Sequence, residues 1–279
     1  EDLDGFFDEY STRNFEMGFS TWAYAPTLEA VDDTYSFIGN HADVYCEHLD
    51  LSVPWNAWMN DTTLPTEFTN EIASRKSRKI SSAKLAVSVS LLNNSRNELA
   101  TDYDGSTPTY TALNDQQIED AYFKHLEYIT TELNPDYLIL AIETNELLIH
   151  APEKWDGYKS LMANIRTRIK AEFPTLNLSE SITLHNLIAP EVDNPNAYIS
   201  EIVSYANSLD FVSISFYPFF KGLNTKEGFQ SAFDLLHEQI TQPIAFAETS
   251  HLSEDLTVES FDLFISGNES EQKYYLEIH

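Results

Sequence analysis

Two glutamates that follow strongly apolar stretches of the sequence could act as a catalytic pair. Glu146 comes just after the apolar run 136–143, and Glu248 lies near the end of a second apolar run, 243–250. Glycoside hydrolysis requires two carboxyl groups that face each other across a cleft. One group is protonated and donates its proton to the leaving oxygen, while the other is ionised and attacks the sugar or activates water. We therefore predict that Glu146 and Glu248 are the catalytic residues.

Other polar and aromatic side chains lie near the ends of similar runs. Tyr217 follows the run 211–216, and His48 and His185 lie at the ends of two more. An aromatic ring can stack on the C–H surface of a sugar, so tryptophans in the loops that follow strands are candidates for substrate binding. Four tryptophans lie in or near such loops: Trp22, Trp55, Trp58 and Trp155.

Glu143 is a competing candidate for the acid, because it also ends the run 136–143. Strand alternation places it on the side opposite Glu146, and we expect it to pack within the barrel or to pair with a cation. The eight histidines form neither His-x-His nor His-Glu-x-x-His, a pattern that favours hydrogen bonding over metal ligation. We predict no metal and no cofactor. A metal-dependent hydrolase would need a ligand cluster, and a Schiff-base aldolase would need a lysine closer to a strand end than Lys221.

The elements that must position these residues alternate regularly along the chain. Seven short β-rich runs, most of them almost continuously apolar, are separated by amphipathic helical stretches such as 115–133 and 155–173. Such alternation predicts parallel strands with helical crossovers. No glycine-rich phosphate-binding turn follows any strand, which counts against an open nucleotide-binding sheet. We predict an α/β fold, a (β/α)8 TIM barrel, with Glu146 and Glu248 facing each other across its mouth.

The number of strands is one short of a complete barrel. After the seventh run, the sequence 258–279 predicts a helix that continues to the last residue, so no eighth strand is left. We therefore expect residues 1–279 to form a single barrel domain that is truncated before strand 8.

Charge and composition exclude several classes of protein. Asp and Glu number 45 against 16 Lys and Arg, which gives a formal charge of −29. So acidic a surface repels phosphate backbones and anionic lipids, and no apolar run is long enough to span a membrane, so we expect neither nucleic-acid binding nor a membrane span. The single cysteine, Cys46, excludes an internal disulfide framework. We expect a monomer that is secreted or periplasmic, although residues 1–10 carry no signal peptide.

The sequence around these residues resembles glycoside hydrolase clan A, and within it the endo-β-1,4-galactanases. The similarity is carried by ILAIETNEL, ITLHNL, SISFYPFF and AFAETSH. The resemblance implies a retaining (β/α)8 enzyme in which Glu146 is the acid/base and Glu248 the nucleophile. It also implies that Asn145 holds the sugar 2-hydroxyl and that Tyr217 hydrogen-bonds to Glu248.

The chain departs from the galactanase pattern in four places. Thr144 stands where those enzymes have glycine, and their motif after strand 3 is absent from SLLNNSRNEL. No arginine ends the second strand, where His48 could occupy the same space, and the tryptophan of strand 8 has no counterpart.

From the residues and the resemblance together we predict a retaining glycoside hydrolase acting on a neutral, β-linked poly- or oligosaccharide. Its two carboxyl groups should lie about 5–5.5 Å apart. We expect at least two of the tryptophans to line the cleft, and Glu146 to have the raised pKa that an acid requires. The alternative is a catalytically silent barrel that binds glycans or a protein partner.

Overall fold

The computed structural model of the chain describes residues 14–50, 52–259 and 263–278. Parallel β-segments form a five-stranded sheet in the order β1-β2-β3-β4-β5 and a three-stranded sheet in the order β6-β7-β8. Segments β5 and β6 are halves of one strand position, separated only by Glu180. The segments are β1 (Gly18–Ser20), β2 (Val44–Leu49), β3 (Lys84–Val89), β4 (Tyr137–Ile139), β5 (Asn177–Ser179), β6 (Ser181–Thr183), β7 (Val212–Phe216) and β8 (Ile244–Thr249).

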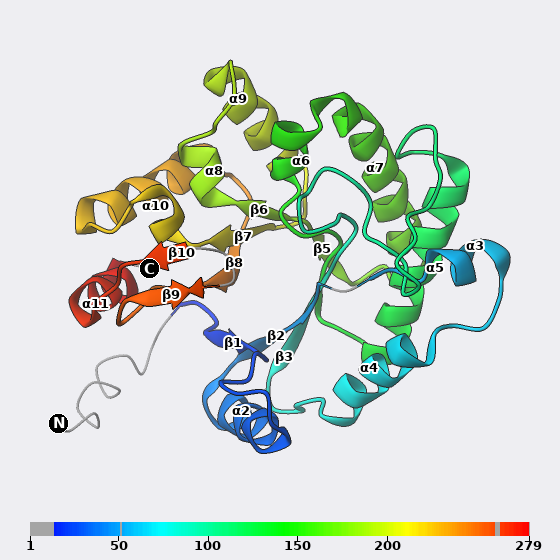
Figure 1. Cartoon of the computed structure of the whole chain (residues 1–279), viewed down its shortest axis with the longest axis horizontal. Coiled ribbons are helices and arrows are strands. Elements are labelled where there is room, and N and C mark those ends of the chain that lie inside the picture. The colour runs from blue at the N-terminus through cyan, green and yellow to red at the C-terminus, as the bar shows by residue number, and fades with distance from the viewer. Residues whose placement is uncertain (1–13, 51, 260–262, 279) are drawn as a thin grey trace.

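Helices follow every strand position and surround the strands (Figure 1). The longer ones are α2 (Leu28–His41), α4 (Thr66–Ser77), α5 (Gln116–Leu133), α7 (Trp155–Glu172), α9 (Pro195–Ala206), α10 (Lys226–Gln239) and α11 (Glu269–Ile278). Short helical turns lie in the connections: α3 (Trp55–Asn60), α6 (Asn145–His150), η1 (Pro152–Lys154), α8 (Leu184–Ile188) and η2 (Pro218–Lys221). The order confirms the (β/α)8 barrel class, of which the described residues supply seven strand positions.

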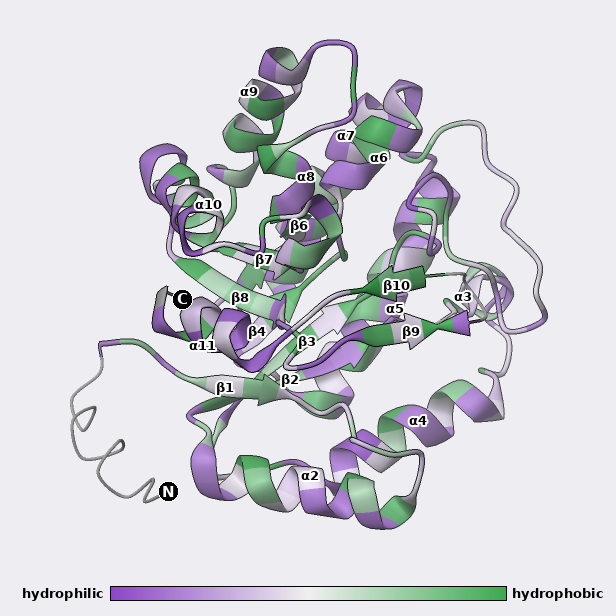
Figure 2. Ribbon diagram, turned by 60° about the vertical axis from the view of Figure 1, so that its left-hand side comes forward, coloured by the Kyte–Doolittle hydropathy of each residue, from purple (hydrophilic) through white to green (hydrophobic). Residues whose placement is uncertain are grey.

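The helices form because their apolar residues recur at helical spacing and face the strands. On α5 the side chains of Ile118, Tyr122, Leu126 and Ile129 are all buried in the core. Figure 2 shows hydrophilic and hydrophobic residues mixed along helices such as α2 and α4. Among the described residues no helix is both long and apolar enough to cross a bilayer.

Strand alternation separates the barrel interior from the layer beneath the helices. On β2, Glu47 points outward, where it binds Arg75 of α4 and accepts a 2.5 Å hydrogen bond from Tyr35 of α2. Cys46 and His48, one residue to either side, point inward, and the Cys46 thiol lies 3.4 Å from Ser88 of β3. The inward positions near the carboxyl ends of the strands therefore carry the polar groups of the barrel mouth.

The end of the described chain differs from the sequence-based expectation. Instead of one helix over 258–279, the chain forms an antiparallel hairpin of β9 (Leu256–Val258) and β10 (Leu263–Ile265) before α11. Helix α11 then packs beside α10, with Tyr275 buried. The two outer strands, β1 and β8, lie close to each other at one point. There the Ser20 hydroxyl of β1 donates a 3.5 Å hydrogen bond to the Ala247 carbonyl of β8. Residues 1–10, on which the expectation about a signal peptide rests, lie outside the described residues.

Candidate active site

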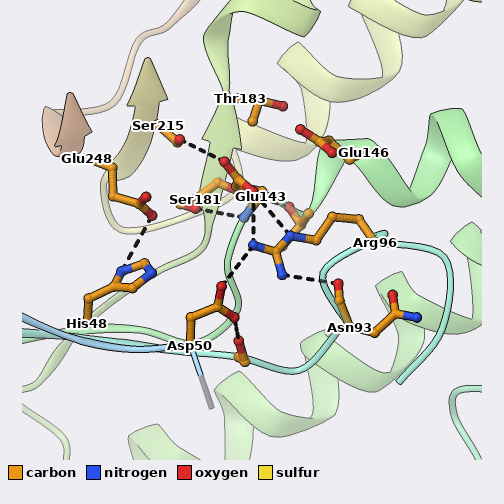
Figure 3. Close-up of polar contacts among 12 residues, drawn as sticks. His48, Asp50, Asn93, Arg96, Glu143, Glu146, Ser181, Thr183, Ser215 and Glu248 are labelled. Carbon is orange, nitrogen blue, oxygen red and sulfur yellow. Dashed lines mark hydrogen bonds and ion pairs between the residues drawn. The ribbon is translucent and has the colours of Figure 1, made fainter. Parts of the chain in front are cut away.

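Glu248 lies at the carboxyl end of β8 and is hydrogen-bonded by one side chain and approached by another. The Tyr217 hydroxyl, just after β7, donates a 3.2 Å hydrogen bond to Oε2 of Glu248. Nδ1 of His48, on β2, lies 3.5 Å from Oε1 (Figure 3). The expected hydrogen bond between Tyr217 and Glu248 is thus present, and His48 occupies the space beside this carboxylate.

The environment of Glu248 disfavours its charged form. Its side chain is only 8% exposed, and this burial, reinforced by the nearby negative charge of Glu143, raises its pKa to about 7. The hydrogen bond from Tyr217 opposes this rise. Burial also lowers the pKa of His48, which favours the neutral imidazole. Glu248 therefore changes its charge close to neutral pH.

Glu146 lies in the first turn of α6, at the same end of the barrel. Nδ2 of Asn186 on α8 donates a 3.0 Å hydrogen bond to its Oε1, and Nε2 of His150 is 3.8 Å from its Oε2. Burial, and secondarily the charge of Glu143, raises the pKa of Glu146. The direction agrees with the raised pKa expected of Glu146, but the expectation that its partner stays ionised is not met, because the pKa of Glu248 is raised as well, to about 7.

Glu143 is paired with a cation, as expected from its position at the end of the run. Its Oε2 accepts hydrogen bonds of 3.1 and 2.9 Å from Nε and Nη2 of Arg96. The Ser215 hydroxyl of β7 donates a 2.8 Å bond to Oε1, and the Glu143 backbone N–H donates a 2.7 Å bond to the Ser181 hydroxyl. Glu143 is thereby fixed in the mouth of the barrel, between Glu248 and Glu146 in the view of Figure 3. The expectation that it lies on the side opposite Glu146 is wrong, because Glu146 belongs to α6 and strand alternation does not extend to it.

Arg96 is the residue of this site that the sequence did not reveal. It lies in the loop after β3, where the Asn93 N–H donates to the Glu98 carbonyl and Leu92 pairs with Leu99 to form a short hairpin. Its Nη2 also lies 3.4 Å from Oδ2 of Asp50, which follows β2. The only signal in the sequence was an isolated arginine in a long polar loop.

Asn145 does not face the site, contrary to the role implied by the resemblance. It is 0% exposed, and its Nδ2 donates to the Thr183 carbonyl at 3.1 Å and to the Tyr198 hydroxyl at 2.8 Å. Its Oδ1 accepts from the N–H and hydroxyl of Thr183 at 2.8 and 3.0 Å. Every hydrogen-bonding atom of the side chain is used within the protein, so in this conformation Asn145 holds α6 to β6 and α9 and does not bind a sugar hydroxyl.

Of the four tryptophans, only Trp22 lies at the site with an exposed ring. It is 57% exposed and meets the His48 ring edge-on, with centroids 5.3 Å apart. The expectation that at least two tryptophans line the cleft is wrong. Trp55 is buried and donates to the Ala100 carbonyl at 2.7 Å, and Trp58 packs in an aromatic cluster that includes Phe68.

Trp155 is likewise a core residue. It is 3% exposed, stacks on Tyr158 with centroids 5.3 Å apart, and donates a 2.8 Å hydrogen bond to Glu201. Its position at the start of α7 suggested a loop residue, but the ring turns inward between α7 and α9. Trp155 is therefore packed almost completely within the protein.

His185 lies on α8 with its ring 5.7 Å from that of the exposed Phe220. Burial lowers its pKa to about 4, so the imidazole is neutral at physiological pH. Its role in substrate binding stays a prediction. In the part of the chain that the structure describes, no three His, Cys, Asp or Glu side chains converge in a way that could hold a metal ion.

Comparison with known proteins shows which solved structures have a similar fold. No family model and no curated protein matches the chain. Among solved structures, a GH53 catalytic domain from Ignisphaera aggregans superposes with a TM-score of 0.56 at 13% identity, covering 92% of this chain and 69% of that one. A GH5 subfamily 18 protein from Bifidobacterium longum, solved with Manβ1-4GlcNAc, gives 0.61 at 13% identity, covering 94% and 65%.

The chain thus shares the barrel fold of these glycoside hydrolase structures. A fungal β-1,4-galactanase is also similar, with a TM-score of 0.54 at 13% identity over 82% of this chain and 68% of that one. The resemblance to clan A and to the galactanases is thus confirmed at the level of the fold. The chain spans about two thirds of the length of these neighbours.

Proposed function

We propose that the protein is a retaining glycoside hydrolase that acts on a neutral, β-linked poly- or oligosaccharide. Glu248 is the nucleophile and Glu146 the acid/base. The observation that supports this most strongly is Glu248 itself, a buried carboxylate at the barrel mouth that is oriented by a hydrogen bond from Tyr217 and lies beside His48. The glycosidase fold and the raised pKa of Glu146 add to it.

The reaction proceeds in two displacements. Glu248 attacks the anomeric carbon while Glu146 donates its proton to the leaving glycosidic oxygen, which forms a glycosyl–enzyme ester. Glu146, now ionised, then removes a proton from water, which attacks the same carbon and releases Glu248. The carboxyl separation of about 5–5.5 Å needed for direct attack stays a prediction.

The exposed ring of Trp22, next to His48, is placed to contact a sugar ring bound over Glu248. We propose a neutral substrate because Arg96 already forms ion pairs with Asp50 and Glu143 and so is not free to bind an anionic sugar. A polymeric substrate agrees with a secreted or periplasmic monomer, which remains our expectation for localisation and assembly.

A panel of aryl β-glycosides and β-linked polysaccharides tests the proposal. The native protein should release reducing sugar from at least one of them, and Glu146→Gln and Glu248→Gln should each reduce kcat by several orders of magnitude. Glu119→Gln, on the outer layer between α5 and α7, is the matched control and should retain activity. Full activity in either active-site variant would contradict the assignment.

A catalytically silent glycan-binding barrel is the second candidate. One observation favours it, namely that Asn145 is turned into the core and is not free for the sugar. Glycan binding in calorimetry, with no hydrolysis of the same glycan by the native protein, would select this alternative.

A further inference from the structure

A third carboxylate lies within the site and has no part in the two displacements. Glu143 accepts two hydrogen bonds from Arg96 and one from Ser215, and Ser215 is the β7 residue paired in register with Glu248. This links Glu143 directly to the strand pair that carries the nucleophile. Figure 3 shows its carboxylate in the centre of the mouth, between Glu248 and Glu146.

The backbone is strained at both ends of the Glu143–Arg96 pair. Glu143 has φ 52° and Arg96 has φ 50°, both in the left-handed region that side chains other than glycine seldom adopt. Two strained residues from different loops meet in a single ion pair, and Arg96 is almost completely buried. Strain retained at a site indicates that the surrounding structure is built to hold these groups there.

Charged and titratable groups face Glu248 from every element packed against it. Strand β2 carries a thiol and an imidazole and is followed by a carboxylate. The end of β4 and the loop after β3 supply the two members of the ion pair, and a phenol follows β7. These groups are Cys46, His48, Asp50, Arg96, Glu143 and Tyr217. Of the two carboxylates in this set, Glu143 acts more strongly on Glu248 than Asp50 does.

We propose that Glu143 is a positioning residue whose fixed negative charge, held in place by Arg96 and Ser215, keeps Glu146 and Glu248 from being ionised together at neutral pH. A like charge nearby disfavours the second ionisation of a carboxyl pair. One glutamate then retains a proton while the other is charged, and the reaction starts from the form in which the proton is on Glu146. The benefit to catalysis rests on the proposed function, whereas the effect on ionisation does not.

Direct titration of the carboxyl groups tests the proposal without turnover. The ¹³C signal of the Glu248 carboxyl, assigned by its loss in Glu248→Gln, is followed by NMR against pH. In Glu143→Gln, which keeps the shape but removes the charge, the midpoint of Glu248 should fall by about 1 pH unit from its native value. Glu119→Gln removes another buried, Arg-paired glutamate outside the site and should leave the midpoint unchanged.

Glu143→Asp separates charge from shape. It keeps the charge but shortens the side chain, so the midpoint of Glu248 should stay closer to the native value than in Glu143→Gln. The reverse order, or an unchanged midpoint in Glu143→Gln, would overturn the proposal. If Glu143→Gln does not fold, Glu143→Ser removes the same charge with a smaller side chain, and a midpoint of Glu248 that does not fall there overturns the proposal equally.

Turnover distinguishes this inference from the proposed function. If the protein is a glycosidase, the acidic limb of kcat/KM should move to lower pH in Glu143→Gln along with the NMR midpoint. A shifted midpoint in a protein without hydrolysis supports the role of Glu143 and rejects the enzyme. Hydrolysis with an unshifted midpoint supports the enzyme and rejects the role of Glu143.

Discussion

At the scale of single residues, Glu248 is subject to opposing influences that decide its charge. Burial and the neighbouring carboxylates raise its pKa to about 7, and the hydrogen bond from Tyr217 lowers it. A nucleophile must be ionised, so its activity is lost as pH falls through this value. The ordinary glutamate pKa of about 4.3 would place that loss far lower.

Tyr217→Phe should therefore move the acidic limb of kcat/KM to higher pH. The variant removes the one hydrogen bond that stabilises the ionised Glu248 while leaving the ring in place. pH–rate profiles of the native and variant proteins measure the shift. A limb that stays in place, or that moves to lower pH, would show that Tyr217 does not stabilise the charge.

The tryptophans should separate into a binding residue and core residues. Trp22→Ala should raise KM with little change in unfolding free energy, because the ring is largely exposed. Trp155→Ala should lower the unfolding free energy by about 3–5 kcal/mol, since it removes a buried ring. Urea unfolding and steady-state kinetics on both variants measure this contrast, and equal stability losses would contradict it.

The sequence placed Trp22 and Trp155 in the same class because both stand near the start of a connection. Which way a ring turns depends on the packing of elements distant in sequence, such as Tyr158 of α7 and Glu201 of α9 around Trp155. Arg96 was missed for a similar reason, since its partners Asp50 and Glu143 come from other strand ends. The pairing of Glu143 with a cation could be predicted, but the identity of that cation could not.

At the scale of elements, Asn145 determines how α6 is fixed to the barrel. Its amide forms four hydrogen bonds to Thr183 and Tyr198, so it joins α6 to the end of β6 and to α9. The resemblance implied a sugar contact because motif similarity aligns residue types along the chain. It does not determine the direction of a side chain at the start of a short helix.

Asn145→Ala should destabilise the protein by about 1–3 kcal/mol, because it removes four hydrogen bonds that its side chain forms with buried groups of Thr183 and Tyr198. Chemical denaturation measures the loss, with Asn186→Ala at the rim as the comparison. A variant of native stability that has lost only kcat would instead support the sugar-binding role.

Other elements show what the sequence could and could not predict. Helix α5 agrees with the expected 115–133 within one residue, because its apolar spacing and buried face coincide. The expectation of one helix over 258–279 combined two separate elements, the β9–β10 hairpin and α11. They are separated at Gly267 and Asn268, where the Asn268 side chain accepts a 3.0 Å hydrogen bond from the Glu271 N–H. This turn and helix-start signal was present in the sequence and was outweighed by the apolar pattern.

At the scale of the whole molecule, the formal charge of −29 implies strong self-repulsion. Raising salt from about 10 mM to about 150 mM shortens the screening length from about 30 Å to about 8 Å. Repulsion among the many unpaired carboxylates should weaken more than the ion pairs do, so the Tm should rise. Thermal melts in NaCl measure this, and a Tm that falls with salt would show that the ion pairs dominate.

The most direct test of the central claim is to trap the glycosyl–enzyme ester. The native protein is incubated with 2-deoxy-2-fluoro analogues of whichever β-glycoside it hydrolyses, and the digested protein is mapped by mass spectrometry. The account predicts one sugar on the peptide that contains Glu248, and none on the intact Glu248→Gln protein. Hydrolysis of the parent glycoside with the label on another residue, or with no label on Glu248, would contradict it.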